Sequence, residues 1–212
     1  MNLEHVRREY LRGGLNRHQL NSDPIIQLQT WLKQATDVEL VDATAMTLAT
    51  VDEQGQPSQR VVLLKRLDQQ GLVFYTNLKS RKAKDIENNN KVSANFGWLQ
   101  IERQVKIQGV ASRLSVAESL AYFSSRPKDS QMAAWASNQS HPIKSRQVLN
   151  QAFAQIKAKF KDGKIPLPDF WGGYRIKPTR FEFWQGGGKR LHDRFEYLLG
   201  EDGQWTIERL AP

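Results

Sequence analysis

The spacing of the β-rich runs constrains the fold of this chain more than any other feature of its sequence. Between residues 45 and 77, the runs AMTLATVD, RVVLLKRLD and GLVFYTN are separated by the turn clusters EQGQP and DQQG, which predicts consecutive hairpins in a meander. Further strand-like runs are KVSANFGW, IERQVKIQGVASRL, RFEFWQ, FEYLL and WTIERL. Because the strands are grouped and no βαβ alternation appears, we expect an antiparallel sheet. A closed or split β-barrel with peripheral helices fits this mainly β pattern best.

Helices are expected at a few defined places around these strands. Asp23-Pro24 supplies an N-cap residue and a proline at the first helical position, and apolar residues follow at helical spacing. Shorter helices are expected over residues 80–89, 115–125, 127–136 and 145–161. The first 20 residues are basic and end near Gly13-Gly14, which indicates a short helix and a flexible joint, together forming an arm.

Length limits the number of domains, and net charge limits the possible partners. At 212 residues the chain is expected to be a single domain, 1–212, with residues 1–20 as the arm. The net charge of +9 favours anionic partners, namely nucleic acid, acidic lipid or phosphorylated small molecules. A hydrophobic content of 39% excludes a wholly disordered basic chain.

Several classes of site and location lose support from the residues that are missing. The chain has no cysteine, which excludes disulfides, thiolate metal sites and a cysteine nucleophile. Its four histidines lack metal-ligand spacing, so no metal is expected. No apolar run reaches the ~18 residues that cross a bilayer, and the charged N-terminus does not resemble a secretory signal, so a cytoplasmic protein is expected. The run Gly186-Gly187-Gly188 lacks the GK[ST] ending of a phosphate loop.

Two short motifs carry the chemistry of phosphate recognition. Ser80-Arg81-Lys82 places two cations in the first turn of a helix, where the helix dipole disfavours them unless an anion binds there. A solvated basic turn, or a helix that begins elsewhere, explains the same residues. In AYFSSRPKDSQ, Tyr122 and Arg126 share a helix face and Ser130 follows across a helix junction, which suits either a phosphate cradle or an ordinary surface hinge.

Two further segments place cations beside apolar or aromatic residues. Arg60 and Lys65 bracket VVLL, and their offset puts them on opposite faces of a regular strand, although water at the strand ends is the commoner environment. Residues 175–194 hold six Lys or Arg against two acids, among Phe181, Phe183 and Trp184. If RLHDR is extended, then Arg190, His192 and Arg194 share one face, which suits a planar anion, single-stranded bases or a solvated edge strand.

Long motifs in a fixed order make the chain resemble the pyridoxine (pyridoxamine) 5'-phosphate oxidases. They are RREYLRGGL, QRVVLLK, VFYTNLKSRKA, IERQV, YFSSRPKDSQ, ASNQS, PLPDFWGGYR, FWQGGGKRLHDRF and the terminal RLAP. The resemblance implies a split-barrel homodimer with FMN bound where the subunits meet. It also implies oxidation of pyridoxine 5'-phosphate or pyridoxamine 5'-phosphate to pyridoxal 5'-phosphate by hydride transfer to the flavin, with dioxygen reduced to hydrogen peroxide, in vitamin B6 biosynthesis and salvage.

The same resemblance assigns roles to individual positions. The implied FMN contacts are Arg60, Val61, Val62, Leu63, Leu64, Lys65, Tyr75, Thr76, Arg81, Lys82, Gln104, Gln139, Ser140, Trp184 and Arg194. The implied substrate contacts are Lys65, Tyr122, Arg126 and Ser130 at the phosphate, Arg190, Leu191 and His192 near the ring, and Arg7 with Tyr10 on an arm that closes over it. Arg190 and His192 are the implied catalytic pair. Two alternatives remain at this point: a flavin-binding split barrel with another redox substrate, and a basic single-stranded nucleic-acid binder.

Overall fold

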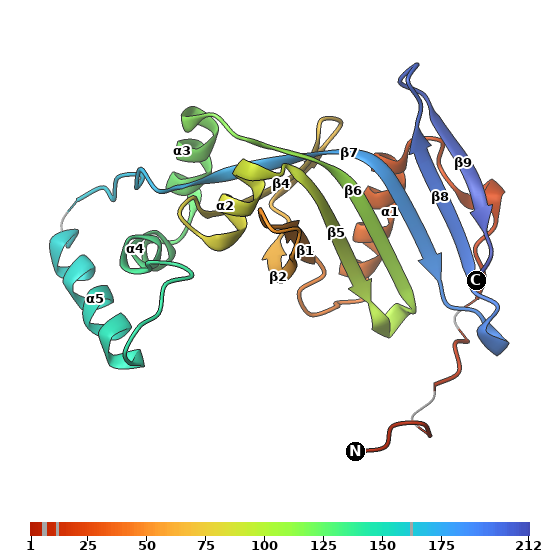
Figure 1. Cartoon of the computed structure of the whole chain (residues 1–212), viewed down its shortest axis with the longest axis horizontal. Coiled ribbons are helices and arrows are strands. Elements are labelled where there is room, and N and C mark those ends of the chain that lie inside the picture. Colours follow the sequence, from red (N-terminus) through yellow and green to blue (C-terminus); the bar gives the residue numbers. More distant parts are fainter. Residues whose placement is uncertain (6–7, 12, 162) are drawn as a thin grey trace.

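The β-rich runs form one nine-stranded antiparallel sheet in a computed structural model that describes residues 1–5, 8–11, 13–161 and 163–212 (Figure 1). The strands are β1 (Ala45–Val51), β2 (Pro57–Leu63), β3 (Arg66–Asp68), β4 (Gly71–Asn77), β5 (Lys91–Trp98), β6 (Arg103–Arg113), β7 (Trp171–Gln185), β8 (Asp193–Leu199) and β9 (Trp205–Leu210). Their order is β2-β1-β5-β6-β7-β4-β3, and the hairpin of β8 and β9 extends from β7. The expected antiparallel, mainly β architecture is confirmed.

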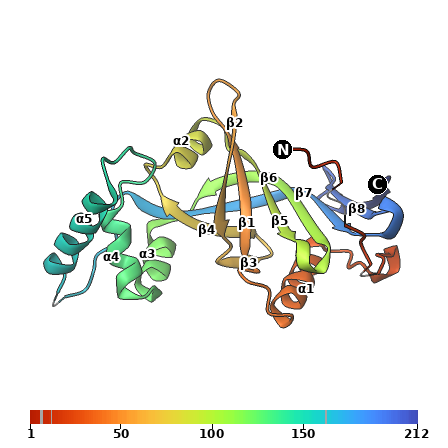
Figure 2. The ribbon, with the colours of Figure 1, turned by 90° about the horizontal axis from the view of Figure 1, so that it is seen from below.

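The meander predicted for residues 45–77 is wrong in one respect. RVVLLKRLD is not a single strand, because β2 ends at Leu63 and β3 starts at Arg66, and these two strands lie at opposite ends of the sheet order. Between them, the Leu64 N–H donates to the carbonyl of Thr44 (2.9 Å) and the Lys65 N–H donates to the carbonyl of Val73 (2.8 Å). The chain therefore crosses from one edge of the curled sheet to the other at residues 64 and 65, where β1, β2 and β4 lie side by side (Figure 2).

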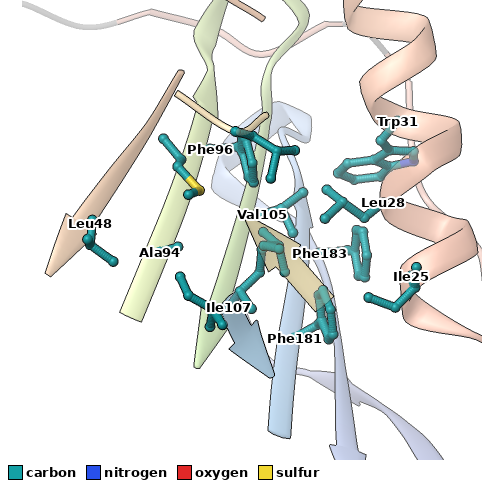
Figure 3. Close-up of a cluster of buried hydrophobic side chains, with 14 of the residues drawn as sticks. Ile25, Leu28, Trp31, Leu48, Ala94, Phe96, Val105, Ile107, Phe181 and Phe183 are labelled. Atoms are coloured by element: carbon teal, nitrogen blue, oxygen red, sulfur yellow. The ribbon is translucent and has the colours of Figure 1, made fainter. Parts of the chain in front are cut away.

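The main core lies between the sheet and helix α1 (Pro24–Asp37), which begins where Asp23-Pro24 predicts it. The Asp23 carboxylate accepts a hydrogen bond from the Ile25 N–H, as an N-cap residue does. Leu28 and Trp31 then point at Phe183 of β7, and the Trp31 and Phe183 rings meet edge to face at 5.2 Å (Figure 3). Each such side chain contributes about 1.5–3 kcal/mol by leaving water.

Four more helices cover one end of the sheet, close to their predicted positions. They are α2 (Arg81–Asn88), α3 (Val116–Ser125), α4 (Lys128–Ala136) and α5 (Arg146–Lys159). A second apolar cluster joins α3 and α4 to the start of β7 through Phe123, Met132 and Trp171. None of the described helices is long and apolar enough to span a bilayer.

The N-terminal arm is not the short basic helix that its composition suggests. In its described part, the first helical residues are the single 3-10 turn Arg17–Gln19. The arm is held instead by side-chain contacts to Glu102, which accepts hydrogen bonds from Arg8 Nη2 (3.0 Å) and the Leu11 N–H (2.9 Å). Tertiary anchoring of this kind outweighs the weak helix propensity of so short a segment.

Candidate functional site

Helix α2 begins in a cluster of cations and polar groups that we call the anion cradle, made of Thr76, Arg81, Lys82, Gln139 and Ser140. The Lys82 ammonium donates to Thr76 Oγ1 and to Gln139 Oε1, both at 3.1 Å. The Arg81 N–H donates to Ser140 Oγ at 3.3 Å. Strand β4, helix α2 and the segment after α4 thus bring together five positions that the resemblance assigns to cofactor binding.

Ser80 occupies the N-cap position predicted for it but does not act as a cap. Its side chain makes no capping hydrogen bond, and its hydroxyl oxygen is buried without a partner in the described part of the chain. No acidic residue lies in the first turn of α2. A buried hydroxyl without a partner beside two cations and a helix N-terminus fits an anionic ligand such as a phosphate ester.

Burial disfavours the charged forms of two cations in and beside the cradle, Lys82 and Arg60. The pKa of Lys82 is lowered to about 8, chiefly by burial and then by the nearby Arg60 guanidinium, while the Asp85 carboxylate opposes the shift. Burial also lowers the pKa of Arg60, and Arg81 adds to this effect. Two neighbouring cations whose charged forms are disfavoured, Arg60 and Lys82, would be stabilised by a dianion bound between them. The donor set therefore fits the phosphate of FMN.

A cavity of about 320 Å³ extends from the cradle toward α3 and α4. Its walls include Lys65, Tyr75, Tyr122, Arg126 and Trp171 together with Thr76 and Gln139 of the cradle. The Tyr75 and Tyr122 rings stack at 3.9 Å, and Tyr75 stacks on Trp171 at 5.3 Å. Ser130 lies in the first turn of α4 and is not part of this wall.

Arg126, in the wall of this cavity, is a second cation besides those of the cradle whose surroundings suit an anionic ligand. Its Nη1 atom is buried and has no hydrogen-bond partner among the residues described, while its guanidinium lies 4.9 Å above the Trp171 ring. Burial lowers the pKa of Arg126. The helix junction at Pro127 places it there, because the N–H of Arg126 closes α3 on the Phe123 carbonyl and α4 starts two residues later. A buried donor facing a cavity fits a phosphate handle better than a solvated hinge.

The remaining predicted residues gather near the far end of β7. Gln104 of β6 is paired with Trp184 of β7, and the Tyr10 ring meets the rings of Trp184 (5.5 Å) and His192 (5.3 Å) edge to face. A Cβ atom on Gly186 would lie 2.7 Å from Cδ1 of Tyr10, so glycine is required for this close approach. A cavity of about 300 Å³ follows, lined by Tyr10, Arg190 and neighbouring residues. Arg7 lies outside the described residues.

The prediction that Arg190, His192 and Arg194 share one strand face is wrong. Residues Gly188–Arg190 form a 3-10 turn in which Arg190 has a φ of 63°, and β8 starts only at Asp193. Strand alternation therefore does not apply before Asp193. Arg194 is bound by neighbours in its own chain: it donates to Glu182 Oε1 (3.0 Å) and to the carbonyl of Ala211 (2.7 Å). Leu191 is 69% exposed.

The segment 60–65 divides its residues between the core and the surface. Leu64 is buried in the main core and Val62 packs against it, so these side chains belong to the fold. Val61 and Leu63 are exposed at 67% and 39%. The prediction that Arg60 and Lys65 lie on opposite faces of one regular strand fails, because β2 ends between them. The two cations nevertheless lie in different places: Arg60 is near Lys82, and Lys65 lines the cavity of about 320 Å³.

The two groups of predicted residues lie at opposite ends of strand β7. Trp171 begins β7 beside the larger cavity, and Trp184 lies at the other end of the same strand. Thirteen residues of strand span roughly 40 Å along its path. Figure 1 shows the same separation, with α4 at one side and β8 at the other. A single chain therefore presents two separate clusters of candidate residues, which we call the cradle half-site, around the anion cradle and the cavity of about 320 Å³, and the Trp184–His192 half-site, around the rings of Tyr10, Trp184 and His192.

Three residues near the half-sites were not identified from the sequence. Trp171 forms the floor under Tyr75 and Tyr122, and Thr50 and Asp85 are buried beneath the cradle. For Asp85 a signal existed, because it follows Lys82 at a spacing of three and shares its helix face. In the part of the chain that the structure describes, no group of three His, Asp or Glu side chains is arranged to hold a metal ion.

Comparisons with known proteins cover both half-sites. Residues 32–160 match the family model described as pyridoxamine 5'-phosphate oxidase, and residues 171–212 match the pyridoxine 5'-phosphate oxidase C-terminal dimerisation region. The pyridoxine/pyridoxamine 5'-phosphate oxidase of Teredinibacter turnerae is 60% identical over 212 residues, with the whole of both chains covered. The enzyme of the same name from Vibrio cholerae is 57% identical over 212 residues, again with both chains covered in full.

Solved structures agree with this result. PhzG from Burkholderia lata, crystallised with tetrahydrophenazine-1-carboxylic acid, aligns with a TM-score of 0.87 at 28% identity, covering 93% of this chain and 98% of that one. A pyridoxamine 5'-phosphate oxidase-related, FMN binding protein from Nostoc punctiforme aligns with a TM-score of 0.74 at 17% identity, covering 91% and 100%, which supports the fold alone. The resemblance seen in the sequence motifs is thereby confirmed.

Proposed function

The chain belongs to the pyridoxamine 5'-phosphate oxidase family, and on that premise we propose how its two half-sites share the work. It is an FMN-dependent oxidoreductase that converts pyridoxine 5'-phosphate or pyridoxamine 5'-phosphate to pyridoxal 5'-phosphate, and it forms a homodimer. Our proposal is that the cradle half-site of one protomer and the Trp184–His192 half-site of its partner close around one FMN. The observation that carries it is the separation of these half-sites along β7. A two-fold axis that joined them would make two equal sites.

The proposed cofactor contacts follow from the cradle. Arg60, Arg81 and Lys82 would neutralise the FMN phosphate, with Ser80 supplying the buried hydroxyl, and Thr76, Gln139 and Ser140 would complete the donor set. The segment 61–65, Tyr75, Gln104, Trp184 and Arg194 would line the flavin. When bound, FMN would accept the proton and two electrons that leave the 4' carbon of the substrate as a hydride, and dioxygen is the proposed final acceptor.

The proposed substrate contacts divide into a handle and a ring site. Arg126, Lys65 and Tyr122 would hold the substrate phosphate, a group that does not react, so that binding energy there fixes the position of the ring. Ser130, which the motif also assigns to the phosphate, lies outside the cavity wall and would have to reach it from the first turn of α4. Arg190 and His192 would lie beside the ring, with Leu191 at the edge. The arm would close over the ring through Tyr10, Arg7 being the second arm residue predicted from the motif.

The geometry of His192 favours a positioning role over proton removal. Its Nδ1 atom accepts a hydrogen bond from the Gly187 N–H at 3.2 Å, so the neutral ring carries its proton on Nε2. A ring in that tautomer presents a donor to the substrate and cannot take a proton at Nε2. Proton removal from the substrate would therefore fall to another group, and Arg190 would orient the ring.

We further propose that the protein is one domain with a closing arm and that it works in the cytoplasm. Both half-sites adjoin the single sheet at the two ends of β7, and the arm is held by Glu102, in the connection between β5 and β6. A chain without cysteine suits a reducing compartment.

Mixing two defective variants tests the shared site. Lys82→Met damages the cradle half-site and Arg190→Ala damages the Trp184–His192 half-site, so each homodimer is expected to be nearly inactive. Random mixing makes half of the dimers mixed, and each mixed dimer has one intact site, so about a quarter of wild-type activity should return. The control is either variant co-refolded with itself. No recovery in mixed dimers of demonstrated composition would contradict the shared site.

A further inference from the structure

Two buried polar side chains join the anion cradle to the strands beneath it. The hydroxyl of Thr50, on β1, donates to Asp85 Oδ2 at 2.6 Å and accepts a hydrogen bond from Arg60 Nη1 at 2.6 Å. Asp85 Oδ2 also lies 3.7 Å from Arg60 Nη2. Thr50 is fully buried and Asp85 is 4% exposed. Neither residue lines the cavities described above, and neither is among the predicted contacts.

The order of these hydrogen bonds is set by chemistry. A hydroxyl has one proton, and an ionised carboxylate only accepts, so the Thr50 proton is directed at Asp85 and its lone pairs face Arg60. Arg60 is held at two more points, because it donates to the carbonyl of Leu48 (3.3 Å) and to Ser58 Oγ (2.9 Å). A guanidinium with five donors still has capacity for a ligand after these bonds. The network therefore restricts the orientation of Arg60 before any ligand binds.

The place of Asp85 needs a reason, because it is a buried negative charge one turn below a site for a dianion. Through space alone it would repel that ligand. Its removal would also leave Arg60 without its buried counter-charge, beside Lys82 and Arg81. The Asp85 carboxylate opposes the lowering of the pKa of both Arg60 and Lys82. The Asp85 carboxylate is thus a fixed counter-charge that orients Arg60 and favours the charged form of Lys82. We expect this benefit to exceed the repulsion between Asp85 and the bound dianion.

We propose that Asp85 and Thr50 are positioning residues for the cofactor phosphate, acting through Arg60, which they hold aimed at the start of α2. The inference rests on the proposed phosphate site and adds two residues behind it. It makes a prediction that a simple charge count does not. If only net charge mattered, neutralising Asp85 would tighten FMN binding, whereas loss of positioning weakens it.

The experiment compares the dissociation constants of FMN and riboflavin, which differ by the phosphate, for apo-protein variants. Thr50→Val keeps the shape and removes the hydroxyl, Thr50→Ser restores it, and Asp85→Asn removes the charge at constant size. Thr47→Val, on the other face of the same strand, is the matched control. Lys82→Met tests the phosphate site itself.

We expect Thr50→Val and Asp85→Asn each to weaken FMN binding about tenfold, the effect of one lost charge-assisted hydrogen bond, with riboflavin affinity unchanged. Thr50→Ser should restore FMN affinity, and Thr47→Val should alter neither ligand. Equal weakening of FMN and riboflavin would reduce the pair to a structural role and overturn the proposal. Tighter FMN binding by Asp85→Asn would also overturn it, since only charge would then matter. If Lys82→Met leaves the affinity for FMN unchanged, the error lies in the proposed phosphate site instead.

Discussion

The affinity for FMN should fall at alkaline pH because of Lys82. In the free protein the pKa of this ammonium is lowered from 10.5 to about 8, first by burial and then by Arg60, with Asp85 opposing. At the proposed phosphate site the phosphate of FMN would bind the charged form of Lys82, so that protonation and binding would be linked. Arg60 keeps its charge throughout this range, because a guanidinium group does not lose its proton in proteins.

The size of the effect follows from the fraction of free protein that carries the proton. One pH unit above the pKa, about one molecule in eleven is protonated, so the dissociation constant at pH 9 should be about tenfold higher than at pH 7. The sign for stability is the opposite. Because the folded-state pKa lies below the unfolded value, the unfolded chain binds more protons between pH 8 and 10.5, and the apo-protein should gain stability as pH rises through that window.

Titration of apo-protein by quenching of flavin fluorescence at pH 7, 8 and 9 measures this directly. Riboflavin, which lacks the phosphate, is the control and should show a flat profile. Lys82→Met should bind FMN more weakly at pH 7 and lose the alkaline decline. A wild-type FMN affinity that stays constant from pH 7 to 9 would refute the reasoning, since Lys82 would then contribute no titrating charge to the phosphate site.

Three other changes have expected outcomes. Arg126→Ala should raise KM for the phosphorylated substrate roughly ten- to hundredfold with little change in kcat, because it removes a contact to a group that does not react; equal loss with an unphosphorylated substrate in steady-state kinetics would contradict this. Arg190→Ala should lower kcat/KM about a hundredfold while the FMN absorption spectrum stays that of the holoenzyme, and unchanged turnover would remove Arg190 from the mechanism. Gly186→Ala should displace Tyr10 and raise KM, whereas Gly188→Ala, where a Cβ atom meets nothing closer than 3.7 Å, should not; equal kinetics for the two variants would show that Tyr10 does not close the site.

Local patterns predicted most of the helices and strands. The start of α1 follows from Asp23-Pro24, and α2 begins where Ser80 predicts it, because capping and proline chemistry act over a few residues. The corner at Arg126 was also visible, since Pro127 ends one helix and starts the next. The role of Ser80 was not visible, because only burial distinguishes a capping hydroxyl from one without a partner.

Local alternation failed where the backbone leaves regular geometry. The positive φ values of Lys189 and Arg190 interrupt the extended run that RLHDR suggests. The break at Leu64 and Lys65 likewise depends on hydrogen bonds to Thr44, which precedes β1, and to Val73 of β4, a strand far from β1 in the sheet order. The alternation of apolar and polar residues along a strand cannot predict either feature, because both depend on contacts with other segments rather than on neighbours in the chain.

The amino-acid sequence alone determined the class of fold, the clustering of cations near aromatic residues and the family, since each of these is written in composition, period or motif. Only the tertiary structure decided that the clusters lie at the two ends of β7 and that Thr50 and Asp85 lie behind Arg60. The physical reason is that burial and hydrogen bonding between distant segments create these sites. Neither quantity exists until the sheet has curled and paired.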